Sequence, residues 1–387
     1  MTDMVYRQPE QVPIEPVLPR WWRTVDRASM AAIFGLFLIG VLLGEAASPI
    51  LAERKGLAEF HYVYRQVVFG IIALATILII SIMSPAQVRR WGVLGFVITL
   101  AAVAGLPFFG TDFSKGAVRW YSLGFTSIQP SEFLKPGFVV VTAWLMSASF
   151  DAKGPPGIFL SFIIAVGVAT LLAFQPDFGQ AALITTAWGV MYFAAGGSMF
   201  LITVLAALVV VAGHVAYNNS AHFAGRMDAF FDTTIDPTTQ IGHAASAIQE
   251  GGFFGVGVGE GVIKRTLPDA YTDFIIAVAA EEFGVVLCFV IIGLFVFIVL
   301  RALIRLLRER DTFTRLAGTG LAVMFGAQAL INLGVAVRLL PAKGMTLPLV
   351  SYGGSSLIAS GIALGMLLAF TRRRPQDELE DVFGTMR

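Results

Sequence analysis

The chain has very little cysteine and histidine: one cysteine, Cys288, and four histidines in 387 residues. Because Cys288 sits inside an apolar run, the sequence excludes a disulfide framework and a thiolate metal site. The histidines, at positions 61, 214, 222 and 243, have no spacing typical of metal ligands. We therefore expect no metal held by histidine or cysteine.

Charge is also scarce, since only 14% of the residues are charged and the net charge is +1. The charges are sorted by loop, so the net charge says nothing about nucleic acid, and we expect no nucleic-acid partner. Hydrophobic residues make up 56% of the chain and the mean hydropathy is +0.77. These values are typical of a polytopic membrane protein.

Apolar segments long enough, or nearly long enough, to cross a bilayer recur along the chain. They predict an all-α polytopic membrane protein of about ten transmembrane helices, with a large outer loop between the seventh and the eighth. The predicted spans are 28–45, 66–82, 92–108, 134–148, 157–173, 180–195, 199–216, 274–300, 315–336 and 350–370. Residues 1–27 lack a signal-peptide core and are predicted to form a disordered cytosolic tail. Residues 28–371 would then form the transmembrane domain, and 372–387 a cytosolic C-terminal tail.

The lysines and arginines predict the orientation of these spans. With the N-terminus inside, the cytosolic connections are short and rich in these residues, such as Arg301, Arg305 and Arg308 after the eighth span. This bias places both termini in the cytosol. The connection 217–273 then lies outside, and it is far longer than an ordinary loop.

Residues 251–259 of this outer loop read Gly-Gly-Phe-Phe-Gly-Val-Gly-Val-Gly. No predicted strand precedes them and no Lys-Ser or Lys-Thr pair follows, so the pattern does not support a nucleotide site. We expect the glycines to permit tight turns beside a bulky ligand or another chain.

Asp273, just before the eighth span, is a catalytic candidate. Thr272 is predicted to cap the helix that begins at Phe274, so that Asp273 lies in the first turn, near the positive end of the helix dipole. At helical spacing Asp273 shares a face with small residues such as Ala277 and Ala280, which let another helix or a long lipid approach closely. The alternative is that Asp273 only caps the helix.

Other polar residues lie at membrane depth or at its edge. Glu132 and Lys135 are three residues apart on one helix face and are predicted to pair, for a functional or a purely structural reason. Trp120, after Arg119, is either an ordinary interfacial aromatic residue or a platform for a sugar ring. The prolines and glycines of segment 340–356 predict irregular backbone that protein or a wet cavity must shield.

Two further pairs of polar residues fall inside predicted spans. Gln328 and Asn332 share one face of the ninth span and are expected to join helices. Glu281 and Glu282 project in different directions from their helix, so at most one of them could serve the same cavity as Asp273.

Four blocks of sequence resemble the signatures of the SEDS family of shape, elongation, division and sporulation proteins. They cover nearly the whole membrane region and run from Arg119 to Glu132, Phe174 to Gly179, Leu267 to Gly284 and Leu340 to Ser356. Residues 264–270 and the run Ala-Ala-Glu-Glu-Phe-Gly at 279–284 look more like the FtsW branch than the RodA branch. Tyr271 stands where the family usually has histidine, and Arg338 adds a cation where FtsW and RodA often have a small or apolar residue.

The resemblance implies a glycosyltransferase that polymerises lipid II, a disaccharide-peptide on undecaprenyl pyrophosphate, on the outer face of the inner (cytoplasmic) membrane. Asp273 matches the aspartate regarded as catalytic in the family, and a positioned carboxylate can take the proton of an attacking sugar hydroxyl. The leaving pyrophosphate gains charge and needs cations. The cations available on the outer side are Arg119, Lys264, Arg265, Arg338 and Lys343. The predicted substrate-binding residues are Arg119, Trp120, Glu132, Lys135, Lys264, Arg265, Lys343 and Ser351.

The implied partners are lipid II, the lipid bilayer, a class B penicillin-binding protein that cross-links the strands, and other divisome proteins. The division septum is the expected location, and a divalent cation is left open as a cofactor. The alternatives are a lipid II flippase, which would need a polar path through the bilayer, and a RodA-like elongation polymerase. A role as a scaffold whose long loop recruits the synthase is compatible with the enzyme.

Overall fold

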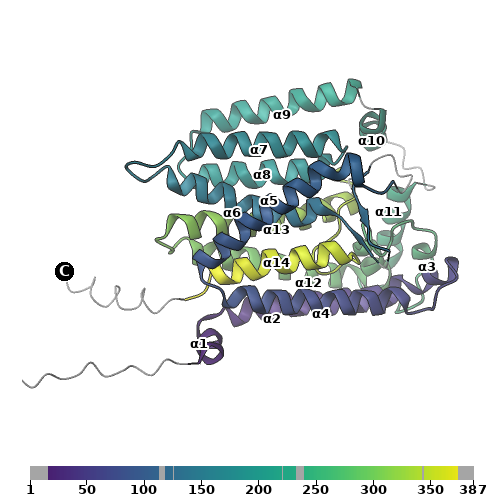
Figure 1. Cartoon of the computed structure of the whole chain (residues 1–387). Coiled ribbons are helices and arrows are strands. Elements are labelled where there is room, and N and C mark those ends of the chain that lie inside the picture. The colour runs from purple at the N-terminus through teal and green to yellow at the C-terminus, as the bar shows by residue number, and fades with distance from the viewer. Residues whose placement is uncertain are drawn as a thin grey trace, which may run out of the picture.

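The computed structural model describes residues 16–112, 118–124, 126–219, 221–231, 239–341 and 344–373. Most of its helices run side by side as a bundle (Figure 1). The helices are α1 (Val17–Thr24), α2 (Arg27–Ala47), α3 (Pro49–Arg54), α4 (His61–Ile82), α5 (Pro85–Phe109), α6 (Pro130–Ala148), α7 (Gly157–Phe174), α8 (Phe178–Ala194), α9 (Met199–Asn219), α10 (Ala221–Phe231), α11 (Gln240–Gly251), the 3-10 helix η1 (Ile263–Arg265), α12 (Ile275–Leu306), α13 (Thr312–Ala336) and α14 (Gly354–Phe370). A short antiparallel pair joins β1 (Tyr121–Ser122) to β2 (Ser127–Ile128).

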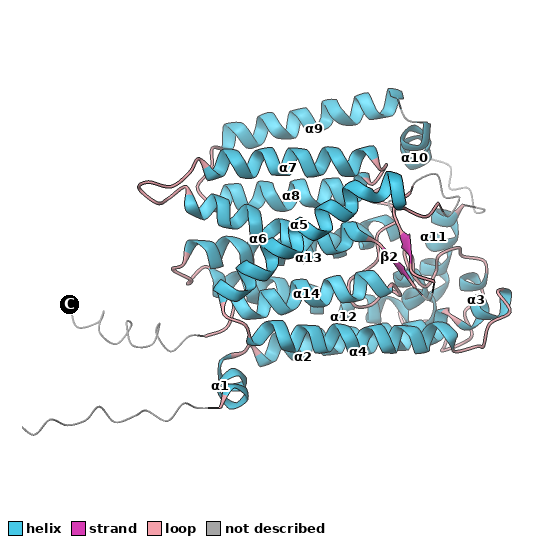
Figure 2. Ribbon diagram, viewed as in Figure 1, coloured by secondary structure: helices cyan, strands magenta, loops and turns pink. Residues whose placement is uncertain are grey.

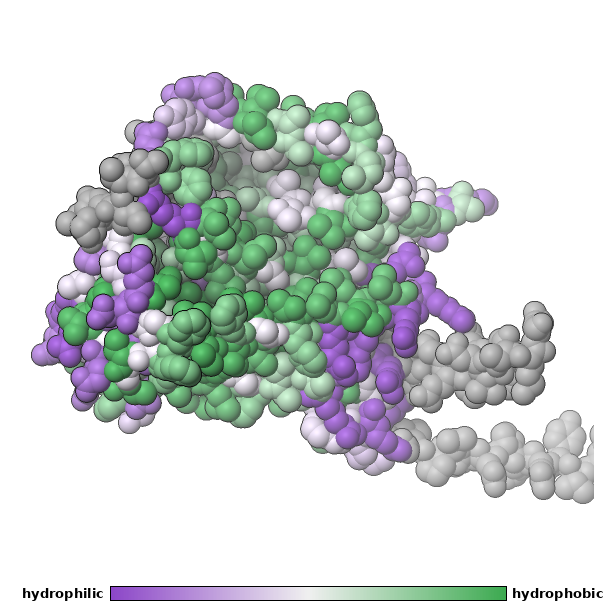
Figure 3. Space-filling model, turned by 180° about the vertical axis from the view of Figure 1, so that it is seen from behind, coloured by the Kyte–Doolittle hydropathy of each residue, from purple (hydrophilic) through white to green (hydrophobic). Residues whose placement is uncertain are grey.

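Among the described residues, seven helices are long and apolar enough to cross a membrane: α2, α4, α5, α7, α9, α12 and α13. Helices α6, α8 and α14, of 19, 17 and 17 residues, occupy the three other predicted spans. Apolar side chains cover the middle of the face seen in Figure 3, and hydrophilic side chains gather toward its two ends. Each predicted span therefore corresponds to a helix among the described residues, and the all-α polytopic membrane architecture is confirmed.

Helix α6 lies in the centre of the bundle, packed against α5, α7, α8, α13 and α14, and most of its residues are buried. Small residues permit this crowding. A Cβ added to Gly137 of α6 would lie only 2.9 Å from the backbone nitrogen of Phe96 in α5. Helix α9 lies at the rim, where it contacts α8 and α10 (Figure 1).

The first and last described segments meet at one end of the bundle, on the left in Figure 2. The backbone nitrogen of Arg373, after α14, donates to the carbonyl oxygen of Thr24 at 3.0 Å. Asp26, only 2% exposed, forms ion pairs with Arg301 and Arg305 at the end of α12. Because the first and last described segments lie at the same end of the bundle, the chain crosses it an even number of times.

Helix α1 corrects one expectation, because it lies within residues 1–27, the predicted disordered tail. Trp21 explains the order of this helix. Its ring is 8% exposed, and its indole nitrogen donates to the hydroxyl of Ser81 in α4 at 3.0 Å. Residues 1–15 of the predicted tail lie outside the described residues.

Helix α12 is broken near its N-terminal end. Its 32 residues would extend about 48 Å at 1.5 Å each, well beyond a hydrocarbon core of about 30 Å. Gly284 has φ 78° and ψ 177°, so the helix is interrupted there. The glycine-rich loop supplies new partners: Val285 N donates to Gly252 O at 3.0 Å, and Val256 N donates to Glu281 O at 2.9 Å. The glycine-rich loop thus packs on α12 at the point where this helix is interrupted.

Candidate active site

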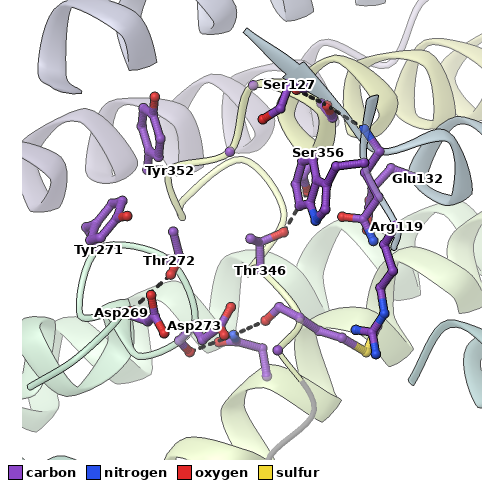
Figure 4. A pocket seen from close by; sticks show the side chains of 18 of the residues that line it. Arg119, Ser127, Glu132, Asp269, Tyr271, Thr272, Asp273, Thr346, Tyr352 and Ser356 are labelled. Atoms are coloured by element: carbon purple, nitrogen blue, oxygen red, sulfur yellow. Dashed lines mark hydrogen bonds between the residues drawn. The ribbon is translucent and has the colours of Figure 1, made fainter. Parts of the chain in front are cut away.

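A cavity of about 620 Å³ lies beside the β1–β2 pair, at the end of the bundle opposite α1. Segments far apart in the sequence line it: α4, the residues around β1 and β2, the turn before α12, the end of α13, and residues 344–356. Its polar lining side chains include Arg65, Arg119, Gln129, Glu132, Asp269, Asp273, Asn332, Thr346 and Ser356. Figure 4 shows most of these converging on one space.

Asp273 lines this cavity from the turn that precedes α12 (Figure 4). The prediction that Thr272 caps α12 is wrong, because the helix begins at Ile275 and its N-cap residue, Phe274, makes no side-chain cap. The Thr272 hydroxyl donates instead to the carbonyl oxygen of Asp269 at 3.2 Å, and the Asp273 backbone nitrogen donates to the same oxygen at 3.1 Å. Asp269 has a left-handed backbone with φ 53°, which makes the turn tight.

Two neighbouring segments hold this turn in place. Asn332 of α13 donates from Nδ2 to the carbonyl oxygen of Asp273 at 2.9 Å. The backbone nitrogen of Tyr352, which precedes α14, donates to the carbonyl oxygen of Tyr271 at 3.0 Å. The position of Asp273 therefore depends on α13 and on the irregular segment before α14.

Tyr62, Tyr271 and Tyr352 form a cluster of three rings at this wall, with centroids 5.4 to 5.5 Å apart. Burial, followed by the negative charge of Asp269, raises the pKa of Tyr271 well above its usual range. Its phenol therefore stays neutral at physiological pH. A neutral aromatic residue thus stands two positions before Asp273, at the position where this sequence departs from the family pattern.

Arg119 lies across the cavity from Tyr271 and Tyr352 (Figure 4). Its Nε donates to the carbonyl oxygen of Gln175 at 3.0 Å, and its Nη2 donates to that of Pro176 at 2.5 Å. These bonds tie the segment before β1 to the turn between α7 and α8. Trp120 lines the cavity next to Arg119, and Arg65 of α4 brings a second cation to it.

The predicted pairing of Glu132 with Lys135 is confirmed, with 2.8 Å between Oε2 and Nζ. Lys135 also donates to Oε1 of Gln328 at 2.7 Å, and Gln328 donates to the carbonyl oxygen of Thr346 at 3.1 Å. Gln180 of α8 donates to Glu132. Glu132 lines the cavity and Lys135 lies behind it, so this network joins the cavity wall to α8 and α13.

Three other predicted substrate-binding residues do not line the cavity. Lys264 is buried in an ion pair with Glu282 of α12. Arg265 is exposed, and Ser351 is buried, where its hydroxyl accepts a backbone hydrogen bond within its own turn. Lys343 lies outside the described residues.

Reasoning from the sequence missed Arg65, Asp269 and Thr346 as lining residues. The one signal for Arg65 in the sequence is its position beside a second polar residue, Gln66, at the start of a predicted span. In the structure Gln66 is 1% exposed. Gln66 donates to the carbonyl oxygens of Gly40 at 2.8 Å and Val350 at 3.2 Å, so it fastens α4 near the cavity.

The sequence of the chain matches a known protein family along most of its length. The match is to the family model FtsW/RodA/SpoVE, described as "Cell cycle protein", over residues 27–376. The chain belongs to this family. The "Probable peptidoglycan glycosyltransferase FtsW" of Caulobacter vibrioides is 40% identical over 356 residues, 92% of this chain and 91% of that protein. A protein of the same name from Alkalilimnicola ehrlichii is 36% identical over 363 residues, 90% of this chain and 89% of that one.

Solved structures share the fold of this member of the FtsW/RodA/SpoVE family. A chain from a study of "polymerization and crosslinking by a peptidoglycan synthase complex" matches with a TM-score of 0.76 at 26% identity, covering 90% of this chain and 97% of that chain. The rod shape determining protein RodA of Thermus thermophilus matches with a TM-score of 0.66 at 25% identity and the same coverage. Within the described part of this family member, no three histidine, cysteine, aspartate or glutamate side chains are grouped so that they could hold a metal ion.

Proposed function

We propose that the protein is a peptidoglycan glycosyltransferase that polymerises lipid II, with Asp273 as its general base. One observation carries the proposal. An aspartate held by its backbone in a tight turn faces a cavity with two arginines, in a chain 40% identical to a probable peptidoglycan glycosyltransferase.

The reaction needs a base on the acceptor sugar. The oxygen of the acceptor hydroxyl forms a bond to the anomeric carbon of the donor, and the hydroxyl proton passes to the carboxylate of Asp273. The bond between the anomeric carbon and the phosphate oxygen breaks, and its electron pair leaves with the pyrophosphate. An activated donor of this kind needs no acid on its leaving oxygen, so one well-placed carboxylate is enough.

The charge that develops on the pyrophosphate needs cations at the cavity. We assign this role to Arg65 and Arg119, which line the cavity from α4 and from the segment before β1. Lys264, one of the cations predicted from the sequence, is better explained by its buried ion pair with Glu282.

The shape of the molecule suits a lipid-linked substrate. The cavity lies at one end of the bundle, and an apolar surface covers the middle of the face in Figure 3. The undecaprenyl tails would stay in the bilayer while the sugars react at the membrane surface. The lysine and arginine bias supports placing this surface outside the inner membrane, with both termini in the cytosol.

We also propose a class B penicillin-binding protein and other divisome proteins as partners, and the septum as the place of action. The similarity to proteins named FtsW at 36 to 40% identity, against 25% for RodA, supports division over elongation. A chain of similar fold belongs to a peptidoglycan synthase complex that couples polymerisation to crosslinking, which supports a partner that cross-links.

The flippase alternative is less well supported. The polar side chains at membrane depth bond to one another, as Lys135 does to Glu132 and Gln328. Glu132 is 5% exposed and Lys135 is 4% exposed. A path for a diphosphate and sugars would have to disrupt this hydrogen-bonded network, at the cost of unpaired buried charge.

The deciding experiment combines purified protein, lipid II and the class B partner, and measures glycan strands on a gel. Asp273→Asn should lower polymerisation by roughly 10²–10⁴-fold, the contribution of a general base, and should still bind the partner. Asp151→Asn, at an exposed position in the connection between α6 and α7, is the matched control. Normal strands from Asp273→Asn would refute the assignment. Transbilayer movement of lipid II without polymer from the unmodified protein would favour the flippase.

A further inference from the structure

Three charged side chains are buried outside the cavity, between η1, α12 and α2. Lys264 is 7% exposed, Glu281 0% and Glu282 1%. Buried charges are costly unless they are paired and hydrogen-bonded, so their contacts indicate what they hold together.

Glu281 binds the backbone of η1. Its Oε1 accepts from the backbone nitrogen of Ile263 at 2.7 Å, and its Oε2 accepts from that of Lys264 at 2.8 Å. The preceding Gly261 makes room for this contact, because a Cβ there would lie 3.0 Å from Cδ of Glu281. A carboxylate that accepts two backbone donors fixes the position of the short helix on α12.

Lys264 secures the same helix through its side chain. Its Nζ donates to Oε1 of Glu282 and, at 2.8 Å, to the carbonyl oxygen of Ala46 at the end of α2. Oε2 of Glu282 has no hydrogen-bond partner among the described residues, so the charge of this carboxylate is balanced chiefly through Lys264.

The ion pair closes a chain segment around Asp273. Lys264 and Glu282 are 18 positions apart, and Asp273 is midway between them. On one side of Asp273 the segment runs back through the tight turn at Asp269 to η1, and on the other it runs through the first, fully buried part of α12. A shift of η1 on α12 would therefore be transmitted to the turn that presents the carboxylate.

We propose that Lys264, Glu281 and Glu282 are positioning residues, which close the 264–282 segment and so fix the carboxylate of Asp273 over the cavity. This inference rests on the proposed function, in which Asp273 is the base. Misplacing a reacting group by about 1 Å can cost about 10²-fold in rate, so a clamp outside the cavity affects turnover without touching the substrate.

The competing interpretation is that Lys264 binds the donor pyrophosphate directly, and paired substitutions separate the two. In Lys264→Met or Glu282→Met the remaining charge is buried and unpaired. Each single variant should lower the turnover number at saturating lipid II by at least about tenfold, with KM changed less than about twofold. In the Lys264→Met, Glu282→Met double variant both charges are gone and two apolar side chains of similar length keep η1 packed on α12, so turnover should return to within about threefold of the unmodified protein. Lys153→Met, an exposed lysine between α6 and α7, is the control.

A double variant as slow as Lys264→Met, or with a raised KM, would overturn the proposal in favour of substrate binding. Glu281→Gln provides a second test that does not rely on the ion pair. The amide nitrogen that replaces one carboxylate oxygen donates and cannot accept, so one of the two backbone N–H groups loses its acceptor. Hydrogen exchange should accelerate at Ile263 and Lys264, and turnover should fall. Faster exchange with unchanged turnover would also overturn it. Absence of polymer from the unmodified protein would count against the proposed function, whereas the exchange rates would still test the clamp.

Discussion

Nδ2 of Asn332 lies 2.9 Å from the carbonyl oxygen of Asp273 and 2.6 Å from that of Met345. One amide group of α13 thus holds both the turn with the proposed base and the irregular segment beside it. Gly344 in that segment passes close to the carboxylate, since a Cβ there would lie 3.6 Å from Oδ2 of Asp273. Asn332 is 2% exposed, so water does not readily replace its amide.

Replacing Asn332 with alanine should impair catalysis more than folding of the bundle. Both carbonyl groups would lose this donor, and each unsatisfied buried group costs about 1–3 kcal/mol. We expect a turnover number about tenfold lower, equivalent to about 1.4 kcal/mol in the barrier, measured with lipid II and the partner protein. Asn218→Ala on the exposed surface of α9 is the control. Equal turnover in both variants would show that the turn is held by its other contacts.

The break in α12 gives a second prediction. A Cβ on Gly284 would lie 2.1 Å from the carbonyl oxygen of Phe253, and the φ of 78° is itself unfavourable for other residues. Gly284→Ala should therefore lower the midpoint of thermal unfolding by several degrees. Gly293, in the same helix, has open space around an added Cβ. Gly293→Ala should therefore leave the midpoint unchanged or raise it, because alanine has up to about 1 kcal/mol more helix propensity than glycine. Similar midpoints for the two variants would contradict this role of Gly284.

Hydropathy predicted the spans well because it depends on an average over many residues. Even α6, which carries Glu132 and Lys135, was recognisable as a span, and the pairing of these two residues followed from helical spacing alone. The prediction that Thr272 caps α12 was wrong because, unlike a span, a cap depends on a single hydrogen bond. The Thr272 hydroxyl has an alternative acceptor in the carbonyl oxygen of Asp269, which only the left-handed turn there brings within reach.

The composition of the cavity could not be read from the sequence, because it depends on which distant segments meet. Arg65 lines the same cavity as Asp273 because α4 packs on α14, where a Cβ on Gly361 would lie 2.8 Å from the carbonyl oxygen of Ala73. Lys264 precedes Asp273 closely in sequence, yet its ammonium group turns to Glu282. Nearness along the chain was thus a poor guide to which cations line the cavity.

The proposed orientation can be tested with reporter fusions. Alkaline phosphatase fused after Arg374 should be inactive, because we expect this end in the cytosol, and the same enzyme inserted between residues 232 and 238 should be active. Both positions lie outside the described residues, so neither insertion interrupts a described helix. The reverse pattern would place the cavity on the cytosolic side and contradict the proposed orientation.

The last prediction concerns Arg65. Replacing it tests whether the arginines that line the cavity act in the reaction or only stabilise the fold. It is half-buried near the start of α4 and lines the same cavity as Arg119 and Asp273. If it stabilises the departing pyrophosphate, its contribution grows in the transition state, so its loss should lower the turnover number more than the affinity for lipid II.

Arg65→Ala should lower the turnover number by roughly tenfold or more, the scale of one charge-assisted hydrogen bond of about 1.5–3 kcal/mol. Arg65→Lys should be intermediate, because lysine keeps the charge but cannot present two parallel donors to a phosphate. Arg90→Ala, at an exposed position near the start of α5, removes the same charge far from the cavity and should have no effect. If Arg65→Ala instead raises KM at constant turnover, the arginine binds substrate and transition state equally, and Arg119 alone would be left to stabilise the leaving group.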